Sequence, residues 1–211
     1  MTNLDLDPVK ARALRATVLL VALLNLGYFF VEAAVAWTIG SVSLFADSVD
    51  FLEDTAVNLL IFTALGWPLA RRAKAGKLMA LVILVPAAAA LWQAIAKFSN
   101  PDAPDPLSLI LTAGGAVVVN SLCAFLLLRH RDHGGSMTKA AWLAARNDVI
   151  INAAIIAIGV SSFTVVRNGW PDLLLGLGIV ALNLHAAREV WEVAEEEHLA
   201  AKALAGEVDD D

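Results

Sequence analysis

Six long apolar segments constrain this chain more than any other feature. A helix needs about 20 apolar residues to cross the hydrocarbon core of a bilayer. We place such spans at about 14–37, 41–67, 78–98, 107–128, 139–164 and 171–191. Of the 211 residues, 59% are hydrophobic and 17% charged, whereas a typical soluble domain has roughly 25% charged residues. The sequence therefore predicts an all-α membrane protein with six transmembrane helices, and it disfavours a soluble helical bundle.

Basic residues predict how these spans are oriented. They precede the first span and occupy the second and fourth connections: Lys10, Arg12, Arg15; Arg71, Arg72, Lys74, Lys77; Arg129, Arg131, Lys139. In the first, third and fifth connections the only basic residue is Arg167. Because cytoplasmic loops carry the excess of Lys and Arg, we expect both termini to be cytoplasmic.

The parts outside the spans are short. We expect residues 1–13 to form a cytoplasmic N-terminal segment, residues 14–191 the transmembrane domain, and residues 192–211 a short acidic cytoplasmic tail. Neither end is long enough to bury a core of its own. No basic stripe indicates nucleic-acid binding, and the single Cys123 excludes a cysteine-based metal cage within one chain. We expect no prosthetic cofactor.

The second span contains four acidic residues, which is unusual for a membrane helix. A charged side chain at the centre of a bilayer costs about 2.5–3.5 kcal/mol on insertion scales, so such residues are candidates for function. At about 100° per residue, Glu53 lies off the stripe that most of the polar residues share. That stripe consists of Ser43, Asp47, Asp50, Asp54 and Asn58.

The fifth span repeats this pattern more sparingly. Ala144, Asp148 and Asn152 follow one another a turn apart, and Asn147 lies about a quarter-turn from Asp148. At ~1.5 Å per residue, Asp148 and the acids of the second span lie near the same depth, close to the midplane. Two antiparallel helices therefore present carboxylates to each other.

Carboxylate and amide oxygens are ligands for hard or borderline divalent cations. Several carboxylates in a low-dielectric site cannot all stay ionised without a counter-charge, so either a cation or protons must lie among them. That alternative occupancy is a mechanism for exchanging metal for protons. The structural alternative, a pair between Asp148 and Arg146, explains one acid and leaves Asp47, Asp50 and Asp54 unexplained.

The roles of other polar residues stay open. Asp47 is either a gate or a packing residue, and interhelical hydrogen bonding is as good an interpretation as site function for Asn25, Glu32 and Asn120. Asp172 is first a favourable charge at a helix start. A loop cluster of His130, Asp132 and His133 is better interpreted as a polar loop than as a metal site.

Two segments resemble the cation diffusion facilitator, or cation efflux, family. They are Gly40–Asp54, with its Ser-rich start and Asp-x-x-x-Asp element, and Ala140–Asn152. The resemblance implies that Asp50 and Asp54 are metal ligands of the second span and that Asp148 is the second ligand of the fifth. Ala144 stands where the family commonly has the other ligand of that span.

This departure implies that Asn147, Asn152 or water supplies the fourth ligand. An all-oxygen site leaves manganese, iron, cobalt and cadmium open beside zinc. The chain resembles the short members that lack the C-terminal cytoplasmic domain. The resemblance also implies the plasma membrane as location and allows a homodimer through the spans, which no motif supports.

We therefore expect a secondary transporter, not an enzyme, that exports a divalent metal cation by proton antiport. Two alternatives remain open. One is a metal-dependent integral-membrane enzyme acting on a lipid-linked substrate, although the longer Asp-Gly-x-x-Ala-Arg element of such transferases is absent from the sequence. The other is a passive cation channel.

Overall fold

The computed structural model describes residues 8–64, 68–128, 135–164 and 168–205, which form six α-helices and no strand. The helices are α1 (Pro8–Ile39), α2 (Val42–Ala64), α3 (Leu69–Lys97), α4 (Pro106–Leu128), α5 (Gly135–Thr164) and α6 (Trp170–Ala205). Several begin or end outside the predicted spans. The largest difference is at α6, which continues through most of the predicted acidic tail.

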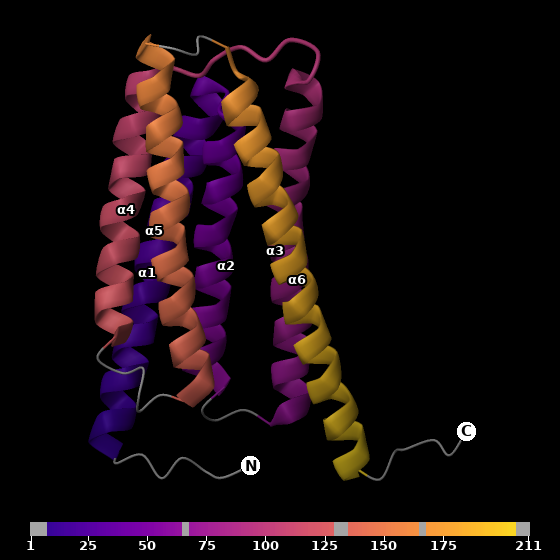
Figure 1. Cartoon of the computed structure of the whole chain (residues 1–211). Helices are drawn as coiled ribbons and strands as arrows, with labels where there is room; N and C mark the ends of the chain where they lie inside the picture. Colours follow the sequence, from indigo (N-terminus) through magenta and orange to yellow (C-terminus); the bar gives the residue numbers. More distant parts are fainter. Residues whose placement is uncertain (1–7, 65–67, 129–134, 165–167, 206–211) are drawn as a thin grey trace.

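The helices run alternately up and down as one bundle, as Figure 1 shows. The described chain begins with α1 and ends with α6 at the same end of the bundle, opposite the α1–α2 and α3–α4 connections. Below, the outer end means the end with those two connections. The inner end means the end where α1 begins and α6 finishes.

Helix α2 lies at the centre of the packing. It contacts α1, α3, α5 and α6, and the most extensive helix pairs are α3 with α6, α4 with α5 and α1 with α2. By contrast, α5 and α6 barely touch. The arrangement therefore divides into a group of α1, α2, α4 and α5 and a flanking pair of α3 and α6 (Figure 1).

Two apolar clusters form the core of the bundle. One lies toward the outer end, contains Leu44, Phe45, Leu109 and Ile155, and also includes buried residues of α3 and α6. The second lies toward the inner end and consists of buried residues from α1, α2, α4 and α5: Leu14, Val18, Val21, Ile61, Cys123, Leu127 and Ala145. Burial of such side chains contributes about 1.5–3 kcal/mol each in water. Within a bilayer, close van der Waals packing takes over much of that role.

Five of the helices, all except α2, are long and apolar enough to cross a membrane in their described residues. Their outward faces carry large apolar side chains, including Leu81, Val85 and Trp92 on α3 and Leu111 and Val118 on α4. An apolar surface this extensive requires lipid or protein against it. Helix α2 fails the same test because of its acidic residues, although the other helices surround it.

The turn between α1 and α2 has a defined geometry. Gly40 has a φ of +65°, which favours glycine, and Ser41 N–H donates to the carbonyl of Ala36 at 3.0 Å. This is the Schellman arrangement that ends many helices. Lys97, at the end of α3, donates its ammonium to the Gly40 carbonyl. A cation there also complements the negative end of the α1 dipole.

Candidate functional site

The polar stripe of α2 points into the bundle. Ser43, Asp47, Asp54 and Asn58 are buried, while Asp50 is partly buried and has one carboxylate oxygen without access to solvent. The neighbouring positions of α2 are Leu, Val, Phe and Ala, which pack against other helices or face outward. The predicted periodicity of the stripe is therefore present in the structure.

Helix α5 contributes Asp148 and Asn152, both buried. The amide nitrogen of Asn152 donates to the backbone carbonyl of Asp148 at 3.0 Å, while its Oδ1 has no hydrogen-bond partner. Asn147 lies outside this buried region. Its side chain is exposed, and its Oδ1 accepts from the guanidinium of Arg146 at 3.4 Å. The quarter-turn between Asn147 and Asp148 takes Asn147 out of the polar interior.

The carboxylates of the two helices lie within electrostatic range of one another. Asp148 interacts with Asp54, Asp47 and Glu53, and Asp50 interacts with Asp148. Nevertheless, no group of three His, Cys, Asp or Glu side chains among the described residues converges closely enough to hold a metal ion. The acids share one buried region between α2 and α5 without forming a closed set of ligands.

Asp54 is also hydrogen-bonded to side chains outside α5. Asn25 on α1 donates from Nδ2 to Asp54 Oδ2 at 3.4 Å, and its Oδ1 accepts from the thiol of Cys123 on α4 at 3.6 Å. Asn58 donates to the backbone carbonyl of Asp54. The sequence assigned no role to Cys123. Its pairing with Asn25 depends on the packing of α1 against α4, for which local sequence carries no signal.

Glu32 and Asp47 form a buried pair near the outer end. Both side chains have 0% exposure, and none of their four carboxylate oxygens has a hydrogen-bond partner at normal distance. Glu32 interacts electrostatically with Asp47, Asp50 and Asp148. The acidic region therefore extends from α2 and α5 to α1.

Asp172 fixes the start of α2 from another helix. Its carboxylate accepts from the hydroxyls of Ser41 and Ser43, both at 2.6 Å, and from the backbone N–H of Val42 at 2.8 Å. The free N–H groups and positive dipole of a helix N-terminus favour such a carboxylate. The prediction placed Asp172 at the start of its own helix, where it is, but did not anticipate that it caps α2.

One turn later on α6, Gly176 lets the two helices approach. A Cβ atom on Gly176 would lie 2.7 Å from the backbone nitrogen of Ser43, closer than packed atoms normally come. Asp172 and Gly176 together hold α6 against the start of α2. Helices α2 and α6 are therefore packed tightly at the outer end of the bundle, whereas α5 and α6 have little contact.

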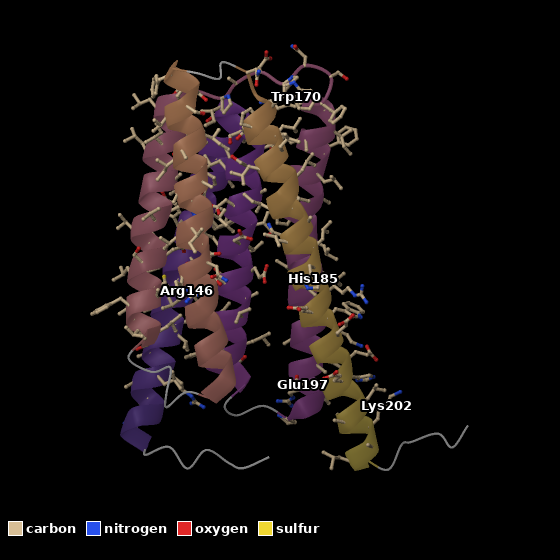
Figure 2. All side chains as sticks on the ribbon, viewed as in Figure 1. Arg146, Trp170, His185, Glu197 and Lys202 are labelled. Carbon is tan, nitrogen blue, oxygen red and sulfur yellow. The ribbon has the colours of Figure 1, made fainter. Side chains whose placement is uncertain are left out.

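The remaining candidates lie elsewhere. Ala144 is in α5, one turn before Asp148. His130, Asp132 and His133 lie outside the described residues. Figure 2 shows His185, Glu197 and Lys202 along the inner half of α6, and Trp170 at its outer start.

With this geometry established, comparison with known proteins gives two findings. The family model described as the cation efflux transmembrane domain matches residues 18–194. The zinc transporter ZitB of Yersinia pseudotuberculosis serotype I (strain IP32953) is 24% identical over 190 residues, which cover 80% of this chain and 57% of the relative. ZitB of Yersinia pestis gives the same values. The chain thus matches little more than half the length of these relatives.

Proposed function

Since the chain belongs to the cation efflux family, we propose that it is a secondary transporter that exports a divalent metal cation in exchange for protons. The family is one of cation transporters and not of enzymes. Together with the apolar helices, this makes the chain a multi-pass protein of the plasma membrane. The identity of the metal, the coupling to protons and the direction are parts of the proposal.

One observation carries the proposal: acids from α2 and α5 face each other inside an apolar bundle. Asp54 and Asp148 are both buried and interact electrostatically. The ion pairs among the described residues involve neither of them. Like charges in a medium of low dielectric require either a cation or protons between them. A site that exchanges one for the other performs antiport.

We assign the cation ligands to Asp50, Asp54, Asp148 and Asn152. The unpartnered Oδ1 of Asn152 supplies an oxygen from α5 in place of the side chain that Ala144 lacks. Asn147 becomes the weaker candidate because it is exposed and bonded to Arg146. Because no three acidic side chains among the described residues converge on one point, we expect cation binding to draw α5 toward α2.

We propose further that α2 is a sixth span and that both termini are cytoplasmic. Two features support this. The helices on either side of α2 meet the requirements for a span, and the chain alternates between the two ends of the bundle (Figure 1). Loops rich in Lys and Arg favour the cytoplasm, and in the sequence they join helices at the inner end. A homodimer formed through the spans stays a prediction, which crosslinking in native membranes tests.

Zinc is the first metal to test because the similar Yersinia proteins carry that name. An oxygen-only ligand set also suits manganese, iron, cobalt and cadmium, since thiolate and imidazole are absent from it. We therefore expect weaker discrimination among these metals than a site with histidine ligands gives.

Uptake of metal into proteoliposomes under an imposed pH gradient tests the proposal. We expect flux of at least one of zinc, cobalt, manganese and cadmium, dependent on the gradient and abolished by Asp54→Ala and by Asp148→Ala. Metal flux that does not depend on the proton gradient would favour a passive channel. The absence of flux for every metal, with folded protein, would remove the transporter proposal and leave the lipid-acting enzyme to be tested.

A further inference from the structure

Glu32 and Asp47 present a chemical problem that the proposed ligand set does not solve. Both carboxylates are completely buried, one on α1 and the other on α2, and none of their four oxygens has a hydrogen-bond partner at normal distance. Asp47 interacts with the side chains of Glu32 and Asn152. An unpaired buried carboxylate costs several kcal/mol, and polar groups in native structures rarely stay unsatisfied. Something that binds carboxylate oxygens is therefore expected between them.

Three other donors toward the outer end of the described bundle are engaged elsewhere. The hydroxyl of Tyr28, one turn before Glu32, donates to the backbone carbonyl of Thr112 at 2.6 Å. The hydroxyl of Ser48 donates to the carbonyl of Phe45 at 2.6 Å. Lys97 directs its ammonium to the carbonyls of Gly40 and Asp102. Within the described part of the chain, no ion pair reaches Glu32 or Asp47.

Asn152 on α5 adds an independent observation. Its side chain has 0% exposure, lies beside Asp47, and has an Oδ1 without a partner. Its Nδ2 is already bonded to the backbone carbonyl of Asp148. Side chains from α1, α2 and α5 thus interact in one buried region. Two carboxylates with an amide oxygen match the chemistry that hard and borderline divalent cations prefer.

We propose that Glu32, Asp47 and Asn152 form a second binding station for the divalent cation, on the outer side of the site at Asp50, Asp54 and Asp148. This inference rests on the proposed transport function. Asn152 belongs to both stations and contributes its oxygen to one at a time. The cation therefore passes from the central site to the outer station by exchanging ligands and without regaining its full hydration shell.

The positions of the ligands along α2 give the distance that the cation would travel between the two sites. Asp47 lies two turns from Asp54 on α2, which at ~1.5 Å per residue is about 10 Å along the helix axis. Asp50 lies between them. Beyond Asp47, the start of α2 is held by Asp172 and Gly176 of α6. The outer station therefore lies between the central site and this fixed start of α2.

Cation binding to the purified full-length chain in lipid nanodiscs tests the station. Equilibrium dialysis with radioactive cadmium would compare the unmodified chain with Glu32→Gln/Asp47→Asn and with Asp54→Asn/Asp148→Asn. These amide substitutions keep the side-chain shapes. Asp102→Asn, in the exposed α3–α4 connection, is the matched control. Thermal unfolding of each variant establishes that it is folded.

We expect a strong and a weaker class of sites in the unmodified chain and in the control. Glu32→Gln/Asp47→Asn should lose the weaker class only, and metal flux should fall about tenfold, as when supporting groups of a metal site are removed. In the double variant Asp54→Asn/Asp148→Asn, cadmium should still shift the infrared bands of the carboxylates. The triple variant that also carries Glu32→Gln should show no such shift.

Other outcomes separate the two proposals. If Glu32→Gln/Asp47→Asn binds as many cations as the unmodified chain, the outer station is wrong while the proposed function stands. The same holds if infrared spectra show a protonated carboxyl group, lost in Glu32→Gln and unaffected by cadmium, because the pair would then hold a proton instead. If the folded chain binds no cation at all, the proposed function fails with it.

Discussion

Asn25 of α1 donates a hydrogen bond to the carboxylate of Asp54 on α2, with a distance of 3.4 Å between Nδ2 and Oδ2. This contact orients the last acid of the polar stripe, and it joins α4 to the site through the thiol of Cys123. Groups that hold metal ligands in place affect metal affinity even though they do not touch the metal.

Asn25→Ala should therefore raise the metal concentration for half-maximal flux about tenfold, because Asp54 loses its orienting donor. Cys123→Ser is the matched control, since a hydroxyl still donates to Asn25, and it should change this concentration little. Dose–response curves of metal flux in proteoliposomes measure both. Equal effects of the two variants would contradict an orienting role for Asn25.

Asp172→Ala should destabilise the protein by about 1–3 kcal/mol, because the buried first turn of α2 loses its acceptor. Denaturant unfolding in detergent micelles measures the change. Asp172→Asn, which retains one acceptor oxygen, should cost less. Equal stability of Asp172→Ala and the unmodified chain would show that water replaces the carboxylate and that the link between α6 and α2 is weak.

Ala144→His should shift metal preference toward zinc, because an imidazole nitrogen one turn before Asp148 would complete a mixed nitrogen and oxygen ligand set. We expect zinc to compete about tenfold better against manganese than it does in the unmodified chain. Competition assays of metal flux measure the ratio, with Ala154→His on the same helix as control. An unchanged ratio would mean that position 144 does not face the cation.

The start of α4 should respond to acid. Hydrogen bonds from the Ser108 side chain and backbone N–H lower the pKa of Asp105, which lies outside the membrane-spanning segments. A lowered folded-state pKa stabilises the folded form above the unfolded pKa of about 3.9, and this is lost as pH falls through the folded value. Hydrogen exchange at the Ser108 N–H should therefore accelerate at acid pH, beyond its intrinsic pH dependence. Asp105→Asn should remove that extra response.

The helices and the acidic stripe were predictable because both depend on local periodicity. Apolar runs define α4 almost completely and α1 in large part, and helical spacing places Asp47 and Asp54 on one buried face. Hydropathy ended the last span near residue 191, whereas α6 continues to Ala205. That extension is rich in Ala and Glu, which favour helix in or out of a membrane.

Interactions between distant segments were not predictable. Asp172 caps α2, whose first residue precedes it by 130 positions. The sequence around Asp172 and around the start of α2 contains no signal that predicts this contact. The polarity of Asn147 made it a candidate ligand, yet its angle on α5 leaves it exposed. Glu32 was placed only in the polar interior, and its isolation with Asp47 depends on where α1 packs against α2.

Proton release on metal binding tests the central claim most directly: that the carboxylates of α2 and α5 hold either the cation or protons. Purified protein in weakly buffered detergent solution would be titrated with zinc or cadmium while a pH-sensitive dye is followed. We predict proton release that saturates with binding and is lost in Asp54→Asn/Asp148→Asn. Metal binding without proton release, or release that persists in this double variant, would contradict the account.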